Sequence, residues 1–558
     1  MRSAPALLLV AAVSGCPAPP ADDDDSSSDA GTAASSGPSA AGASSSSRGM
    51  ASSVVWTGSG TTSRQNSSSA RASSAQPSST ASPVSASSTS AAPSSSSAAA
   101  LTSSSSAGTS GPPGTCAPRT AAADVDPWTV RAPGVGSAGI TTSSAGGHND
   151  VLLMSPDDYI RLGVRLDWGG SVVFFGLTAN TGSNVIDAND TGRELQLALY
   201  DPTRAKQQCA RDASCLVSPS TCAEGITYLG WDPVQGGDEC NHGSTSTYEH
   251  VGDTLRVVVH PLQWNPDWDA PDCRQSACGA AGVPVAVTYT LDFRFVTTHV
   301  VEVAMEIHSD EALDHPSTAQ EFPTLYVSNG AAGPDLPLLL DASGTEVNIN
   351  QQVLPSLFVL DFASTAPWVA FQDPGRTYGV GLAADQGLTG FQGWRGDGAS
   401  YPYFHNVRPS IQFGLGAGAT VRGIAYLALG NFPTVSGQIA AATGARPPFG
   451  HVDAPAEGAT TTYAPGSPVT VTGWVLDGTP QGAVEVQVDG SSAGMITVNA
   501  ARPDVCAVYP AYAGCPAVGF AGTVSTSGWA ACSHLLQVVA TDADGNRTVL
   551  GERNLQPQ

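Results

Sequence analysis

The stretch Val285–His308, VAVTYTLDFRFVTTHVVEVAMEIH, decides the fold class because apolar and polar residues alternate along it in two runs. Successive side chains of a β-strand point to opposite faces of its sheet, so each run predicts a strand with one buried face. The apolar sets are Tyr289, Leu291, Phe293 and Phe295 in the first run and Val301, Val303, Met305 and Ile307 in the second. If both sets face one core across a hairpin, Arg294 lies opposite Glu302 and Thr290 lies opposite Glu306.

The outward face of this predicted hairpin is charged. It carries Asp292, Arg294, Glu302, Glu306 and His308. Such a face is either a solvated sheet surface or the floor of a polar cleft, and the residues alone leave both alternatives open. We take Glu306 as a candidate catalytic carboxylate and His308 as a candidate substrate-binding residue.

The same alternation recurs along the chain. The further strand-like runs are Tyr159–Leu166, Glu194–Tyr200, Leu255–His260, Trp368–Gln372, Tyr378–Ala383 and Val421–Leu429. No segment keeps an apolar stripe with helical spacing over several turns. We therefore predict an all-β protein whose main part is a large β-sandwich, or supersandwich, domain.

The composition argues against several classes of protein. The chain has 23 Lys and Arg against 48 Asp and Glu, a net charge of -25, so no nucleic-acid partner is expected. Only 13% of residues are charged, and Lys206 is the sole lysine. This is typical of an exported β-rich protein rather than of a helical cytosolic enzyme.

The N-terminus has the features of an export signal. A short apolar run, Ala6–Val13, follows Met1-Arg2 and is far shorter than the roughly 20 residues that span a bilayer. The next residues, Val13-Ser14-Gly15-Cys16, resemble the lipobox of bacterial lipoproteins. The resemblance implies a signal peptide over residues 1–15, a lipid anchor on Cys16, and a location at the bacterial outer membrane or cell surface. An ordinary secretory signal with a chance cysteine is the alternative.

The remainder divides by composition. Residues 16–115 are almost all Ser, Ala, Thr, Gly and Pro, which predicts a disordered stalk because such a chain buries too little apolar surface to offset its ordering entropy. We expect the large β-sandwich domain over residues 116–446. A smaller β-sandwich module is expected over residues 447–558.

The C-terminal module resembles a bacterial Ig-like domain. The resemblance rests on Gly450–Asp453, Gly473–Asp477 and Ala540–Asn546, and Asp-Gly pairs between short strands predict tight turns. The spacing Asp542-x-Asp544-x-Asn546 also suits a Ca²⁺ loop, but no bidentate Glu follows at the twelfth position. Turn chemistry explains the pattern, and no metal site is predicted.

The cysteines of an exported chain predict disulfides. Apart from Cys16, the chain has Cys116, a cluster of Cys209, Cys215, Cys222, Cys240, Cys273 and Cys278, and Cys506, Cys515 and Cys532. Cys506 with Cys515 is a natural local pair, whereas the pairing within the cluster stays open. Zinc binding is the competing interpretation, but no Cys-x-x-Cys pair supports it.

The loop Asn189–Gln196 brings a carboxylate, a guanidinium and an amide together just before a predicted strand. Arg193 and Gln196 are suited to bind sugar hydroxyls, and Asp190 is a candidate catalytic carboxylate. The structural alternative is an Asx turn closed by an Asp190–Arg193 ion pair.

A second loop, Trp231–Glu239, places an indole before amide and acid groups. Within it we take Trp231 and Gln235 as candidate substrate-binding residues and Asp238 as a candidate catalytic residue. Trp264 and Trp268 add two more indoles, and apolar sugar faces pack on such rings while carboxylates and amides bind the hydroxyls. The two loops together suggest a glycan groove, and buried structural tryptophans are the alternative.

Residues 150–430 resemble the galactose-mutarotase-like β-sandwiches of carbohydrate-active proteins. The resemblance rests on Gly169-Gly170, the Asn189–Arg193 loop, the Trp231–Pro233 loop, Glu321–Pro323 and Trp368–Phe371. The Asn-His-x-Tyr-Phe stretch associated with aldose epimerases is missing. The resemblance therefore implies a polymer-acting or polymer-binding protein rather than a simple sugar mutarotase.

Two classes of function follow. The first is a surface lipoprotein that binds polysaccharide or another glycan without cleaving it, or serves as a structural or adhesive protein. The second is an enzyme that cleaves glycosidic bonds with paired carboxylates drawn from Asp190, Asp238 and Glu306. The sequence contains neither a Gly-x-Ser-x-Gly elbow nor a His-Glu-x-x-His motif, and no cofactor is expected.

Substituting Cys16→Ala should release the protein from the membrane fraction, because the predicted anchor is the lipid on that cysteine. Fractionation of cells followed by immunoblotting measures this. Continued sedimentation of the variant with membranes, in the absence of any second anchor, would contradict the lipobox assignment.

Overall fold

The computed structural model of the 558-residue chain describes residues 119–188, 194–200, 228–230, 244, 246–263, 285–331, 333–400 and 402–558. All of these belong to one compact unit. The predicted signal peptide, lipidation site and stalk lie outside the described residues. Within the ranges given, no helix is long and apolar enough to cross a membrane.

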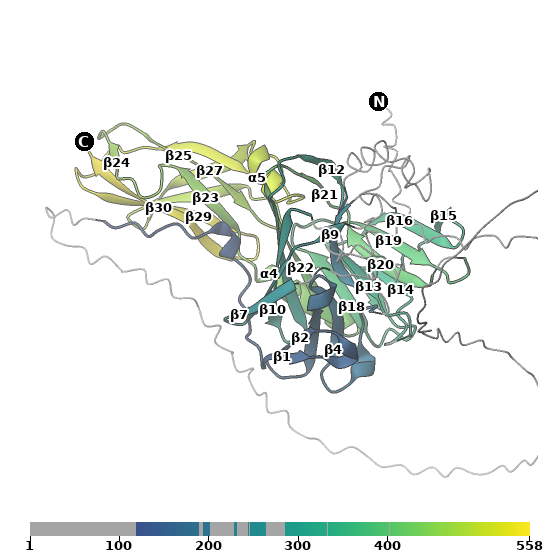
Figure 1. Ribbon diagram of the computed structural model, residues 1–558. Helices are drawn as coiled ribbons and strands as arrows, with labels where there is room; N and C mark the ends of the chain where they lie inside the picture. The colour runs from purple at the N-terminus through teal and green to yellow at the C-terminus, as the bar shows by residue number, and fades with distance from the viewer. Residues whose placement is uncertain are drawn as a thin grey trace, which may run out of the picture. The chain divides into compact units, whose positions relative to one another are not determined.

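Two large sheets contain most of the strands of the described chain (Figure 1). Sheet A has the strand order β1 (Gly139–Ser143), β2 (Asp150–Met154), β3 (Ile160–Arg165), β4 (Ser171–Leu177), β5 (Leu195–Tyr200), β13 (Glu321–Val327), β20 (Phe404–Pro409), β19 (Gly390–Gly396), β16 (Leu357–Ala363) and β15 (Gln351–Leu354), with β6 (Tyr228–Gly230) paired to β5 and to β9 (Leu262–Gln263). Sheet B has the order β14 (Leu338–Asp341), β17 (Trp368–Gln372), β18 (Gly379–Ala384), β22 (Thr420–Leu429), β11 (Val300–Ser309), β10 (Val287–Thr297), β8 (Thr254–Val259) and β7 (Ser246–Val251). A short pair joins β12 (His315–Ala319) to β21 (Gln412–Leu415).

The predicted hairpin and its register are confirmed. β10 and β11 pair antiparallel with Thr290 opposite Glu306 and Arg294 opposite Glu302. Their inward residues join those of sheet A in one core, which includes Leu162, Leu197, Phe293, Met305 and Val407. The fold is therefore the predicted all-β sandwich, and every predicted strand is present within two residues of its expected bounds.

Two α-helices in the described residues are not predicted by the sequence. α4 (Phe432–Gly444) follows β22 and buries Val435, Ile439 and Ala442, which are spaced by four and three residues on one helix face. Its N-cap is Asn431, whose side chain accepts a hydrogen bond from Thr434 N at 3.0 Å. α4 packs on sheet B at Gly381, where a Cβ atom would lie 2.3 Å from Val435.

The C-terminal strands form a third sheet with its own core (Figure 1). Its order is β23 (Phe449–Ala454), β25 (Val469–Leu476), β28 (Gly519–Val524), β27 (Ser491–Ala500), β26 (Ala483–Val488), β29 (His534–Thr541), β30 (Arg547–Pro557) and β24 (Thr461–Tyr463). Asp489 and Gly490 turn β26 into β27 with φ of 51° and 80°, and Asp542 accepts a hydrogen bond from Asn546 N at 2.8 Å. Both are the turn chemistry expected from the sequence.

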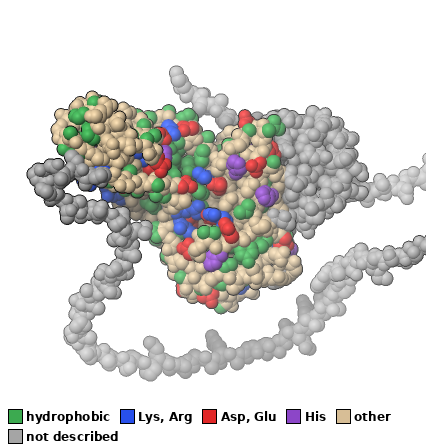
Figure 2. Space-filling model, turned by 60° about the vertical axis from the view of Figure 1, so that its left-hand side comes forward, with side chains coloured by type: hydrophobic (Ala, Val, Ile, Leu, Met, Phe, Trp, Pro, Cys, Tyr) green, Lys and Arg blue, Asp and Glu red, His purple; other side chains and the backbone are tan. Residues whose placement is uncertain are grey.

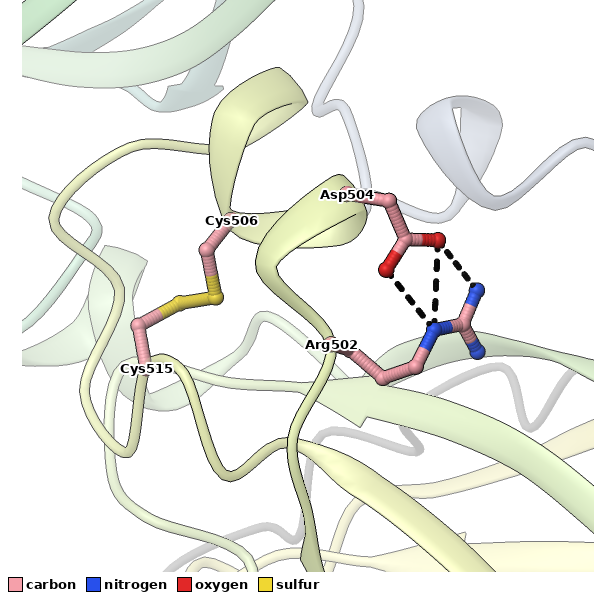
Figure 3. The surroundings of a disulfide bond; sticks show 4 residues. All are labelled: Arg502, Asp504, Cys506 and Cys515. Atoms are coloured by element: carbon pink, nitrogen blue, oxygen red, sulfur yellow. Dashed lines mark hydrogen bonds and ion pairs between the residues drawn. A yellow bond between two sulfur atoms is a disulfide. The ribbon is translucent and has the colours of Figure 1, made fainter.

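The predicted disulfide is confirmed. Cys506, in the short helix α5 (Pro503–Val508), is bonded to Cys515, nine residues along the chain. Figure 3 shows the bond beside the paired side chains of Arg502 and Asp504, whose closest atoms are 2.8 Å apart. Cys532 is disulfide-bonded as well.

The first described residues are fastened to the C-terminal sheet before the chain enters sheet A. Asp124 accepts two hydrogen bonds from the buried guanidinium of Arg553 on β30, at 2.7 and 2.8 Å. The backbone N–H of Ala122 donates to Glu552, also on β30, at 2.8 Å. We call these contacts the N-terminal clasp.

We expect Asn431→Ala to lower the free energy of unfolding by about 1 kcal/mol, because it removes the side-chain cap of α4. Urea unfolding followed by circular dichroism measures the change. Asn431→Asp, which keeps an acceptor in the same place, should stay close to the parent protein. Equal stability of the Ala and Asp variants would show that the cap contributes nothing.

Candidate functional site

A row of polar side chains crosses the outer face of sheet A, opposite the core. We call the polar row the five residues Gln196, Thr324, Arg408, Gln392 and Asp361, on β5, β13, β20, β19 and β16. Cross-strand pairing puts Gln196 opposite Thr324, Gln392 opposite Arg408 and Asp361 opposite Gln392. The register of β13 with β20 brings Thr324 to Arg408 in the same way. Strands far apart in sequence thus line up one continuous polar strip.

Hydrogen bonds fix the half of the row on β20, β19 and β16. Gln392 Oε1 accepts from Arg408 Nε at 3.0 Å and from Trp394 Nε1 at 2.7 Å. Gln392 Nε2 donates to Asp361 Oδ1 at 2.7 Å. Because Gln392 is bonded at both ends of its amide, its orientation and that of Arg408 are set together.

Glu321 on β13 links this half to β5. Its Oε1 accepts from Arg408 Nη1 at 2.6 Å and from the Tyr200 hydroxyl at 2.7 Å, and its Oε2 accepts from Gln196 Nε2 at 3.1 Å. Arg408 and Glu321 are both buried. An ion pair with this many additional hydrogen bonds is a fixed element of the face.

The charge states of the network follow from its burial. Burial, with Glu321 next to the hydroxyl, raises the pKa of Tyr200 well above its usual value. Burial lowers the pKa of Arg408, but the charge of Glu321 outweighs this effect and the net pKa is raised. Tyr200 is therefore a neutral hydrogen-bond donor and Arg408 a permanent cation at physiological pH.

Three polar atoms on this face have no partner. Among the residues that the structure describes, Gln196 Oε1, Thr324 Oγ1 and Asn406 Oδ1 are buried and make no hydrogen bond. Their residues are 4%, 0% and 3% exposed. Other unpaired atoms occur elsewhere, at Gln372 and Gln386 for example, but these three lie on the neighbouring strands β5, β13 and β20. A buried polar atom without a partner costs about 1 to 3 kcal/mol, so the face is built to receive water or a polar ligand.

The two carboxylates of the network are far apart. Neighbouring strands are about 4.8 Å apart, and β13 and β16 are three strands apart, so the backbones of Glu321 and Asp361 are roughly 14 Å from each other, with the side chains of Arg408 and Gln392 between the two carboxylates. Paired carboxylates that hydrolyse glycosides are about 5 to 10 Å apart. These two residues therefore do not form such a pair.

The outer face of sheet B is different. A groove of about 320 Å³ lies on it, with Ala304, Thr290 and Glu306 among its lining residues and Trp128 beside them. The outward hairpin residues Asp292 and Glu306 thus line a groove, one of the two alternatives that the sequence left open. On the face drawn in Figure 2, basic and acidic side chains lie intermixed.

The charges around this groove are already paired with one another. Arg256 binds both oxygens of Asp292, at 2.7 and 3.0 Å, and Arg422 Nε donates to Glu306 at 2.7 Å. The guanidinium carbons of Arg131 and Arg422 lie 4.9 and 5.6 Å from the ring centre of Trp128. Because arginines cover the indole, which is only 8% exposed, Trp128 is not a free stacking platform.

The described candidates from the sequence lie on two different sheets. Gln196 belongs to the polar row of sheet A, whereas Glu306 and His308 are on β11 of sheet B. His308 Nδ1 is 3.0 Å from the Thr420 hydroxyl. The remaining candidates, which lie outside the described residues, are Asp190, Arg193, Trp231, Gln235, Asp238, Trp264 and Trp268. Their grouping into one groove stays a prediction.

Sequence reasoning did not single out Arg408, Gln392 or Asp361. Each of them faces outward on its strand, and most strands with one buried face carry polar residues on the other face. Their polarity alone therefore does not mark a site. Only the strand order, which joins β5 to β16 through three intervening strands, brings them together. Within the described ranges, no group of His, Cys, Asp and Glu is arranged to hold a metal ion.

Comparisons with known proteins give structural neighbours only. No protein-family model matches the sequence, and no curated protein matches it significantly. A putative aldose 1-epimerase from Escherichia coli K12 is 10% identical with a TM-score of 0.28, over 49% of this chain and 97% of that one. A galactose mutarotase-like protein from Clostridium acetobutylicum is 10% identical with a TM-score of 0.31, over 53% of this chain and 99% of that one.

A polysaccharide lyase is 9% identical with a TM-score of 0.27, and the match covers 72% of this chain but only 46% of the lyase. The neighbours thus include β-sandwich folds of the aldose epimerase and galactose mutarotase-like type. Because their TM-scores are so low, we base no functional conclusion on them.

Two glutamates of the sheet B face should differ sharply in their effect on stability. Glu302 is fully buried, 2.8 Å from Arg294 Nε and 3.7 Å from Arg131 Nη1, so Glu302→Gln removes the counter-ion of Arg294 and leaves Arg131 with Asp292 alone. We expect a loss of about 3 kcal/mol in the free energy of unfolding. The matched control Glu306→Gln breaks a partly exposed pair and should cost at most about 1 kcal/mol. Equal losses in urea unfolding would contradict this assignment.

Proposed function

We propose that this protein is an exported, lipid-anchored surface protein that binds polysaccharide or another glycan on the outer face of sheet A. The observation that carries the proposal is the set of unpaired buried atoms of Gln196 and Thr324 in the polar row and of Asn406, two residues from Arg408 on β20. A ligand that can donate to them would remove their cost in the bound state.

The chemistry of the face suits a hydroxyl-rich ligand. Sugar hydroxyls donate and accept hydrogen bonds, and the face combines amide and hydroxyl groups with a fixed ion pair. The predicted loop Asn189–Gln196 runs directly into β5, so its Asp190 and Arg193 are joined to Gln196 by only a few residues of chain. This connection supports placing the predicted glycan groove at sheet A rather than at sheet B.

Binding without cleavage is the form of the proposal that the described residues favour. Arg408 compensates the charge of Glu321, and Glu321 and Asp361 are both hydrogen-bonded within the network, with Arg408 and Gln392 between them. The second candidate is a glycan-cleaving enzyme whose carboxylates come from the loops, with Asp190 and Asp238 as the pair. The Asp190→Asn variant distinguishes the glycan binder from the glycan-cleaving enzyme.

The surface location rests on the lipobox-like Val13–Cys16 and the Ser/Ala-rich residues 16–115. We also propose that the C-terminal module is Ig-like, because tight turns such as Asp489-Gly490 join its short strands. Such a module spaces or stabilises a binding domain. Its clasp to Asp124 is in keeping with a stabilising role.

Gln196→Ala should weaken glycan binding roughly tenfold, because it removes both an unpaired acceptor and a contact that holds Glu321. The parent protein is first tested for binding against a broad panel of soluble and insoluble glycans. The matched control is Gln537→Ala on β29 of the C-terminal sheet, which removes a 2.6 Å hydrogen bond to Glu552. This variant should leave glycan affinity unchanged, because β29 is not part of sheet A. Failure of the parent protein to bind any glycan would overturn the proposed function.

The same panel separates a binder from an enzyme. Release of new reducing ends or unsaturated products is measured for the parent protein and for Asp190→Asn. An enzyme that uses Asp190 loses turnover in the variant, whereas a binder shows no turnover at all and loses only part of its affinity. Turnover that Asp190→Asn leaves intact would remove Asp190 from the catalytic role.

A further inference from the structure

We infer that the disulfide between Cys506 and Cys515 is an interlock: by closing its loop, it fastens the C-terminal module to the β-sandwich domain. Side chains of this loop lie in an interface that belongs to both parts of the chain. The inference concerns how the two parts are coupled, and it does not depend on glycan binding.

One hydrophobic cluster contains residues of both parts. Its members include Ile424, Tyr426 and Ile439 of the sandwich domain and Phe449, Trp474 and Val518 of the C-terminal module. The loop adds Tyr509 and Tyr512, which are 4% and 2% exposed. The ring centre of Tyr509 lies 6.0 Å from that of Trp128 and 5.7 Å from that of Trp474. The loop is therefore packed between the two parts and is not displayed on the surface of one of them.

The Tyr512 hydroxyl also joins a buried ion pair of the sandwich domain. Asp385, which follows β18, is paired with Arg446, which follows α4, and both are buried. The Tyr512 hydroxyl donates to Asp385 Oδ2 at 2.6 Å and accepts from Arg446 Nη1 at 2.7 Å. Burial raises the pKa of Tyr512 to about 12, so this hydroxyl stays protonated at physiological pH. Because buried charges depend on such additional hydrogen bonds, undocking Tyr512 would be costly.

The disulfide restricts the loop that carries both tyrosines. Residues 509–518 lie between α5 and β28 and belong to no helix or strand. Cys506 in α5 is bonded to Cys515, and both cysteines pack against the shared cluster. Fewer conformations are open to a cross-linked loop than to a free one, so the disulfide lowers the entropy lost when Tyr509 and Tyr512 become ordered.

Closing the interlock is a two-electron oxidation. The two thiols give up two protons and two electrons as the S–S bond forms, and a small-molecule disulfide such as oxidised glutathione takes them up and becomes two thiols. Disulfides persist in oxidising compartments and are rare in the cytosol. Firm coupling of the two parts is therefore expected only after the chain has reached an oxidising compartment.

The double variant Cys506→Ala, Cys515→Ala tests the interlock in the full-length protein. The oxidised parent should unfold in one calorimetric transition, because its two parts share a hydrophobic cluster. The double variant should unfold in two transitions, and hydrogen exchange on β29 of the module should become faster relative to exchange on β22 of the sandwich domain. Two transitions in the oxidised parent, or a single one in the double variant, would overturn the inference.

A pair of tyrosine variants tests the same coupling with the disulfide intact. Tyr512→Phe removes only the hydroxyl that reaches the buried ion pair, so it should speed hydrogen exchange in α4, on the sandwich side of the interface. The matched control is Tyr463→Phe, which removes a hydroxyl that donates to Ala530 O and Cys532 O within the C-terminal module, at 3.0 and 3.1 Å. This control should leave exchange in α4 unchanged.

Combining Tyr512→Phe with the double cysteine variant completes the test. In that background it should have no further effect on α4, because the opened loop no longer holds the tyrosine in the interface. Unchanged exchange in α4 in the parent background, or the same change in both backgrounds, would overturn the inference. Neither result bears on the proposed function, which is tested by glycan binding.

Discussion

The register of the β10–β11 hairpin is the constraint on which the rest of the sandwich depends. Because side chains alternate between the faces of a sheet, a slip by one residue would turn Phe293 and Met305 to solvent and bury Arg294 and Glu302 against sheet A. β8 and β22 extend the same register outward on either side. The pairing of β10 with β11 therefore determines which side chains of β8, β10, β11 and β22 face the core. The apolar face that results is the surface on which sheet A packs.

The polar side chains on the outer faces of the two sheets are paired in different ways. On sheet B, arginines and carboxylates satisfy each other, as at Arg256 and Asp292, so the groove there has little left to offer a ligand. On sheet A, the Arg408–Glu321 pair satisfies itself but holds neighbouring groups whose hydrogen bonds remain unmade. Among the described residues, unpaired buried atoms occur on both faces, at Glu302 Oε2 on sheet B and at Gln196, Thr324 and Asn406 on sheet A, but only on sheet A do several of them lie on neighbouring strands.

The features that the sequence predicted are local ones. Period-two alternation predicted the strands and the hairpin register, and the Asp-Gly pair predicted the turn at Asp489, since each depends on residues close together in the chain. α4 was missed because its buried positions are few, although Asn431 and Pro433 are both signals of a helix start. The polar row was missed for another reason: alternation tells which face of a strand a residue occupies but not which strands become neighbours. For the same reason Gln196 and Glu306 were grouped in one site, although they belong to different sheets.

The N-terminal clasp has a mechanical consequence. β1 is the edge strand of sheet A, and a pull on the chain entering it would peel it from β2 one hydrogen bond at a time. The contacts of Ala122 and Asp124 with β30 intercept that pull, because β30 is held between β29 and β24 within the C-terminal sheet. Tension arriving from the preceding chain is thereby passed to β30, a strand that is paired on both sides. The contacts with the C-terminal sheet thus protect the edge of sheet A from being pulled open by the chain that precedes it.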